Sequence, residues 1–145
     1  MTQIFPVDGI HRQDHVFAAR PRKLGPPKTS LFQSDVDVAG DEIQLRVYDL
    51  DGNTPRTPIY GGTSSILIDA GAPDSAMYTA AQLPWPGDGD DIGYTFIHRI
   101  AFDATNAAGV NWTGGHKYRV WYEFTTIAEG FIQLVFDVAV KSVKP

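Results

Sequence analysis

Residues 117–140 alternate apolar and polar side chains, and this pattern limits the fold more than any other feature of the chain. In residues 117–127 and 131–140 nearly every second position is apolar, and Glu129-Gly130 lies between the two runs. Because successive side chains of a β-strand point to opposite faces, this period of two indicates two half-buried strands. A short connection containing glycine is typical of a hairpin. The sequence therefore predicts an antiparallel β-hairpin near the C-terminus.

Shorter runs of the same kind occur earlier, at residues 43–48, 64–69 and 94–102, with a further apolar pair at Val36 and Val38. The intervening segments are rich in turn formers, and the chain of 145 residues contains 14 Gly and 10 Pro. Residues 49–53 are predicted to be a turn, and residues 71–93 a long connection. About seven short strands in a domain of this size are typical of an antiparallel β-sandwich. We therefore predict an all-β domain over residues 36–145.

The first 35 residues have a different character. Residues 1–30 contain four prolines and carry five basic against two acidic side chains, whereas the remaining residues carry seven basic against fifteen acidic. Prolines favour extended backbone and break helices, although one or two helical turns within residues 11–19 are an alternative. We predict an extended arm over residues 1–35. Its spaced apolar residues and its charge indicate attachment to another surface.

Composition narrows the class of protein. Cysteine is absent, so the chain forms no disulfide and has no thiolate metal site or cysteine nucleophile. No apolar leader or span of ~18 apolar residues is present, and we expect synthesis in a cytosol and no membrane contact. The net charge of −5 argues against nucleic acid as the main ligand.

We predict no enzyme, cofactor or metal site. The chain contains none of the short nucleophile-elbow, phosphate-loop, dinucleotide or zinc-protease motifs. Asp49, Asp51 and Asn53 resemble the start of a calcium loop, but Thr54 and Tyr60 stand where glycine and a bidentate glutamate are required. An Asp-rich turn is the preferred interpretation.

Two other clusters contain metal-ligating side chains. Residues 88–91 hold three aspartates, which we interpret as a solvated loop tip, with Ca²⁺ binding as the alternative. His11 and His15 are four residues apart, a spacing that would suit a metal only on a helix. His98 and His116 are expected at packed or surface positions of strands.

Two groups of residues are candidates for binding a partner. The first comprises the arm residues Phe17, Arg20, Arg22, Lys23 and Lys28. The second comprises the three tryptophans, Trp85, Trp112 and Trp121, as an oligomer or glycan surface. The last two strands also place some apolar residues on their second face. That face is either covered by loops or forms a subunit interface.

The C-terminal motifs resemble a known family. Three segments are similar to the C-terminal end of immunoglobulin-like domains in tailed-phage virion proteins. They are WTGGHKYRVWYEFT at residues 112–125, the glycine turn at residues 129–130 and FDV at residues 136–138. VYDLDGN at residues 47–53 resembles an early strand and turn of such domains. The resemblance covers roughly residues 42–140. It implies an antiparallel immunoglobulin-like β-sandwich.

The resemblance also implies a virion accessory role. Small phage proteins of this kind decorate or cement the capsid, often as trimers. We therefore expect a non-enzymatic homo-oligomer, preferably a trimer, that is assembled in the host cytoplasm. It is expected on the capsid surface, where its arm binds the major capsid protein. The alternatives are a tail or fibre adaptor and a glycan-binding β-sandwich module.

Overall fold

The computed structural model describes residues 2–10, 12–23, 43–60, 66–68, 77–82, 94–105, 109–126 and 130–142, all of them in strands, turns or irregular segments. Within this part of the chain no helix is long and apolar enough to span a membrane. The strands are β1 (Thr2–Ile10), β2 (His15–Ala19), β3 (Ile43–Asp49), β4 (Ile66–Ile68), β5 (Met77–Gln82), β6 (Tyr94–Ile100), β7 (Lys117–Thr126) and β8 (Gly130–Lys141). The protein is thus all-β in its described residues.

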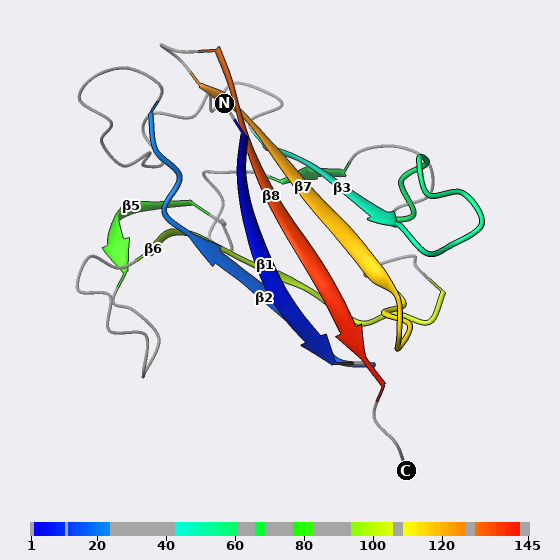
Figure 1. The fold of residues 1–145 in the computed structure, drawn as a ribbon. Coiled ribbons are helices and arrows are strands. Elements are labelled where there is room, and N and C mark those ends of the chain that lie inside the picture. The colour runs from blue at the N-terminus through cyan, green and yellow to red at the C-terminus, as the bar shows by residue number, and fades with distance from the viewer. Residues whose placement is uncertain are drawn as a thin grey trace.

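Five strands form one sheet in the order β1-β8-β7-β3-β4 (Figure 1). The predicted C-terminal hairpin is confirmed, because β7 and β8 pair antiparallel from Lys117↔Ala139 to Thr126↔Gly130. Strand β1 lies on the other side of β8 and runs parallel to it. The remaining pairs in this sheet are antiparallel.

Three strands form a second sheet in the order β2-β6-β5. The two sheets pack face to face through aromatic side chains: the rings of Phe17 and Phe136 are 5.0 Å apart, and those of Phe96 and Tyr122 are 4.7 Å apart. The predicted alternation in residues 43–48 is confirmed, since Ile43, Leu45 and Val47 are fully buried between the sheets. The core therefore consists of the apolar half of each alternating strand.

The prediction of an arm is wrong for Thr2–Ile10 and His15–Ala19, because these segments are strands of the two sheets. Strand β1 pairs with β8 along its whole length, and β2 pairs antiparallel with β6. The single Pro6 is compatible with β1 because a strand at the edge of a sheet has unpaired N–H groups on one side. The helical alternative is also wrong, since His15–Ala19 is a strand. Residues 24–42, including Val36 and Val38, lie outside the described residues.

A second correction concerns residues 71–93, which were predicted to be a long connection. Met77–Gln82 forms β5, which pairs with β6 through Met77↔Phe96 and Gln82↔Tyr94 with a register shift between them. The sequence MYTAAQ lacks a clean period of two, so alternation alone does not reveal this strand.

Candidate interaction face

The candidate site is the outer face of the five-stranded sheet, which we define as the side chains of β1, β8, β7 and β3 that point away from the second sheet. Figure 1 views the molecule from this side, and none of the described strands crosses in front of it. The strand register arranges these side chains in rows across the sheet. One row reads Ile4, Val135, Trp121 and Arg46, and the next reads Pro6, Asp137, Arg119 and Tyr48.

The first row is mostly apolar. Ile4 is 60% exposed, and Val135 beside it is almost completely buried. Trp121 is half-buried, and its indole nitrogen is buried without a hydrogen-bond acceptor in the part of the chain that the structure describes. Phe131, which lies on the same face of β8, is also 60% exposed. Large exposed apolar residues on one face are typical of a contact surface.

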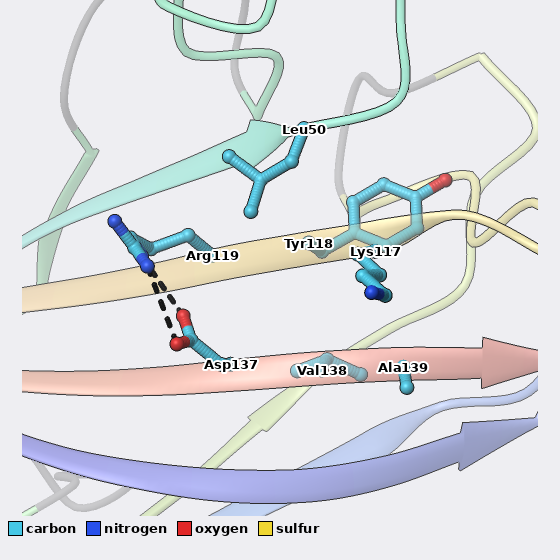
Figure 2. Close-up of a pocket in the computed structure, with 7 residues that line it drawn as sticks. All are labelled: Leu50, Lys117, Tyr118, Arg119, Asp137, Val138 and Ala139. Atoms are coloured by element: carbon cyan, nitrogen blue, oxygen red, sulfur yellow. Dashed lines mark hydrogen bonds and ion pairs between the residues drawn. The ribbon is translucent and has the colours of Figure 1, made fainter.

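The second row contains an ion pair in the middle of the sheet. Arg119 donates to both carboxylate oxygens of Asp137, at 2.8 Å from Nε and 3.3 Å from Nη2 (Figure 2). This hydrogen-bonded carboxylate raises the pKa of Arg119 further. The bidentate geometry holds both side chains in fixed positions. Tyr48 completes the row, and its ring lies 6.5 Å from that of Trp121.

A groove of about 400 Å³ opens at the end of this face, next to the Arg119–Asp137 pair. Leu50, from the turn after β3, forms one wall (Figure 2). The other lining residues come from β7 and β8 and are Lys117, Tyr118, Arg119, Asp137, Val138 and Ala139. The turn is tied to β7, because the Leu50 N–H donates to the Lys117 carbonyl at 2.9 Å. The groove therefore combines an apolar wall with a nearby lysine.

The aspartates that resemble a calcium loop hold this turn together. The Asp51 N–H donates to Asp49 Oδ1 at 3.1 Å, and the Lys117 N–H donates to Asp51 Oδ2 at 2.7 Å. Asp49 also pairs with Nδ1 of His116 at 2.9 Å. Among the described residues no three metal-ligating side chains gather in one place. The predicted Asp-rich turn is confirmed, and His116 lies immediately before β7.

The predicted arm residues lie elsewhere. Phe17 is 1% exposed and belongs to the core, so it cannot contact a partner in this fold. Arg20 is half-buried, and its Nε and Nη1 find no hydrogen-bond acceptor in the described part of the chain. Arg22 is exposed and Lys23 half-buried. Lys28 lies outside the described residues, as do Trp85 and the acidic segment 88–91.

The tryptophans differ in their surroundings. Trp112 is fully buried, with its ring stacked 4.6 Å from that of His15 and packed edge-on against Tyr118. It therefore cannot serve as an exposed sugar platform. Trp121 is the one predicted surface residue that the structure places on the outer face. Its neighbours Arg46 and Tyr48 were missed as site residues, although the alternation in residues 43–48 already assigns them to the polar side of a strand.

Tyr118 makes a local contact that fixes the segment before β7. Its hydroxyl accepts a hydrogen bond from the Thr113 N–H at 2.7 Å and donates to the Asn111 carbonyl at 3.1 Å. Burial raises the pKa of Tyr118. This hydroxyl therefore stays protonated and satisfies two backbone groups of residues 111–113.

A histidine–tyrosine pair lies between the sheets. Nδ1 of His98 and the hydroxyl of Tyr122 share a hydrogen bond of 2.8 Å. Burial lowers the pKa of His98 to about 4 and raises the pKa of Tyr122 well above its usual range. Both groups are therefore neutral at pH 7, and their contact joins β6 to β7 within the core.

No protein-family model and no curated protein matches this chain.

Proposed function

We propose that the two sheets form an immunoglobulin-like β-sandwich. The strand orders β2-β6-β5 and β4-β3-β7-β8 correspond to the B-E-D and C′-C-F-G strands of that architecture. In this assignment β7 is strand F and β8 is strand G. Strand β1 then takes the position of an N-terminal strand beside strand G.

The hydroxyl contacts of Tyr118 support this assignment independently. Immunoglobulin-like domains carry a tyrosine near the start of strand F whose hydroxyl bonds to the backbone a few residues upstream. Tyr118 is the second residue of β7, and its partners are at Asn111 and Thr113. These contacts of the tyrosine in the W-x-x-G-x-x-Y motif therefore support the proposal of a tyrosine corner at Tyr118.

We further propose that the chain is a non-enzymatic accessory protein of a tailed-phage virion. It decorates or cements the capsid and binds the major capsid protein. The outer face is the observation that supports attachment best, because its aromatic and arginine side chains are the types enriched at protein interfaces. Since Phe17 is buried in the core and Thr2–Ile10 is a strand of the larger sheet, we place the contact on Ile4, Trp121, Arg46 and Tyr48.

Charge favours an acidic partner for this face. Arg46 donates to Gln44, a neutral side chain, at 3.2 Å. Among the described residues no carboxylate forms an ion pair with Arg46 or with the ammonium of Lys117. Two cations without a described counter-charge beside exposed apolar residues suit a surface that supplies carboxylates.

Binding to capsids of the source phage tests this proposal. Particles lacking the protein are mixed with purified chain and sedimented, and the bound fraction is measured against protein concentration. We expect Arg46→Glu to weaken binding by about tenfold or more, since it places a negative charge against acidic groups. Arg22→Glu is the matched control, because Arg22 is exposed after β2 in the other sheet.

The two variants separate the possible contacts. Loss of binding with Arg22→Glu alone would return the contact to the N-terminal segment and remove the outer face. Failure of the unchanged protein to bind any capsid would contradict the capsid role. Native mass spectrometry of the free protein tests the expected homotrimer.

A second candidate is a glycan-binding module or a tail or fibre adaptor. Trp121 favours this candidate, because its half-buried ring could contact a sugar while the Arg119–Asp137 pair in the next row supplies polar groups for the sugar hydroxyls. Glycan binding is measured by titrating the protein with oligosaccharides from the host surface and recording its tryptophan fluorescence. A signal that Trp121→Phe removes would favour the module over capsid decoration.

A further inference from the structure

Strand β1 is attached to the rest of the fold in an unusual way. It hydrogen-bonds to β8 over nine residues, from Thr2↔Gln133 to Ile10↔Lys141, and forms the edge of the sheet. In sequence, however, it is followed at once by β2, which belongs to the other sheet (Figure 1). The strand is thus held laterally by the last strand of the chain and covalently by a short connection.

The side chains of β1 add to the core without forming its centre. Phe5 and Val7 face the core but stay partly exposed, whereas Phe136 and Val138, their partners in β8, are 2% and 1% exposed. The rings of Phe5 and Phe136 are 5.5 Å apart. Removal of β1 would therefore uncover the edge of β8 and the side chains of Phe136 and Val138, which Phe5 and Val7 cover in this structure.

The connection between β1 and β2 is short and strained. Residues 12–14 are the described part of the connection from one sheet to the other. Arg12 has a φ of 60°, and it is the only residue other than glycine with positive φ in the described part of the chain. This left-handed conformation crowds the Cβ of any residue except glycine. The strain would be released if the connection became extended.

The far end of the connection is anchored to the second sheet. Asp14 accepts a hydrogen bond from the Phe102 N–H at 2.8 Å and pairs with Arg99 at 3.2 Å. These contacts fix the start of β2 next to β6. The hinge therefore lies before Asp14, at the strained position, and the movable element is β1 alone.

We propose that β1 exchanges between copies of this chain, so that β1 of one copy docks on β8 of another in the same register. The exchanged contact reproduces every β1–β8 interaction of the closed form, because the strand and its acceptor are identical in both copies. The extended hinge relieves the strain at Arg12, and a short strained hinge favours exchange of this kind. A reciprocal exchange gives a two-fold dimer, and a sequential exchange gives a closed ring such as a trimer. This inference does not depend on the capsid role.

The absence of cysteine permits a direct test. Ile4 and Val135 are register partners on the outer face, and neighbouring strands place their Cα atoms about 4.8 Å apart, within the range of a disulfide. The double variant I4C/V135C is folded in reducing buffer over a range of concentrations and then oxidised. An exchanged strand yields a disulfide between two chains, seen on a non-reducing gel and by mass spectrometry. A closed strand yields a disulfide within one chain.

The pair R119C/D137C is the matched control, because β7 and β8 are consecutive strands of a hairpin and bond within one chain in both forms. We expect the chain-to-chain fraction of I4C/V135C to rise with concentration and that of the control to stay near zero. A mixture of isotopically labelled and unlabelled chains should give mixed dimers for the first pair. Exclusively intrachain disulfides for I4C/V135C at every concentration would overturn the proposal.

Arg12→Gly, introduced into I4C/V135C, tests the hinge. Glycine adopts positive φ without the Cβ penalty, so it should favour the closed form in each chain and raise the concentration for half-exchange by about tenfold or more. Removal of Gln13 shortens the connection and should have the opposite effect. An unchanged or lower half-exchange concentration with Arg12→Gly would show that strain at this residue does not drive exchange and would overturn the proposed mechanism.

Discussion

The inner and outer faces of β7 and β8 are built from alternate residues of the same two strands, yet they differ in almost every property. Tyr118, Tyr122 and Phe136 on the inner face are at most 2% exposed and contact the second sheet or the segment before β7. Arg119 and Asp137 on the outer face are about 40% exposed and contact each other. A shift of one residue along a strand therefore separates side chains that stabilise the fold from side chains available to a partner.

The largest effect should come from the inner face. Phe17→Ala removes a ring that packs against Phe136 and Tyr122 and leaves a cavity, so the free energy of unfolding should fall by about 4 kcal/mol. Val16→Ala, at a position that is 46% exposed in the same strand, should change it by less than about 0.5 kcal/mol. Urea denaturation measures both. Equal, small effects would mean that β2 is not part of the core.

The next effect is a pH dependence from the inner face. The pKa of His98 is about 4 in the fold against 6.5 in the unfolded chain. Between these values the unfolded state binds the proton and the folded state does not. The free energy of unfolding therefore decreases as pH falls from about 6.5 to 4, by about 3 kcal/mol in all. In His98→Gln this pH dependence should be absent, while the contribution of the carboxylates remains. The free energy of unfolding is therefore measured against pH for both proteins, and the difference between the two curves gives the contribution of His98.

A smaller effect should follow loss of one hydroxyl. Tyr118→Phe leaves the Thr113 N–H and the Asn111 carbonyl without their partner, and we expect a loss of about 2 kcal/mol. Tyr48→Phe on the outer face removes the same atom from a half-buried ring and should be near neutral. Thermal and urea unfolding compare the pair. Identical losses would argue against a tyrosine corner at Tyr118.

The smallest effect on stability should come from the outer face. The Arg119–Asp137 pair is partly exposed, so a double-mutant cycle with alanine should give a coupling of about 1 kcal/mol or less. If the outer face binds the partner, the same variants should weaken that binding more than they weaken the fold. A coupling of several kcal/mol, with unchanged binding, would mean that Arg119 and Asp137 stabilise the fold as the inner-face residues do and do not bind a partner.

The sequence predicted the regions whose period of two is regular. The hairpin of residues 117–140 and the strand at Ile43–Asp49 were confirmed because each buries one face against a second sheet. Strand β1 was misinterpreted because Pro6 and the basic residues that follow suggested an arm. Strand β1 pairs with β8, which is more than 120 residues away in sequence, and a local sequence pattern does not predict such a long-range pairing.

The candidate face was only partly predictable. Alternation assigns Trp121 and Arg119 to the side opposite Tyr118, and the structure confirms it. The rows that join them to Ile4, Arg46 and Tyr48 require the order of strands in the sheet. That order is determined by contacts between residues that are distant in sequence, and one amino-acid sequence does not reveal those contacts.

The parallel pairing of β1 and β8 has a mechanical consequence. Thr2 lies beside Gln133 and Ile10 beside Lys141, so the N-terminal end of β1 and the C-terminal end of β8 lie at opposite ends of the same pair of strands (Figure 1). Tension applied to the two ends of the chain would slide the strands past each other. All of their hydrogen bonds would then carry the load together, whereas a pull across the hairpin would open its bonds one after another. The strand that we propose to exchange between copies thus also forms the strand pair best oriented to resist stretching.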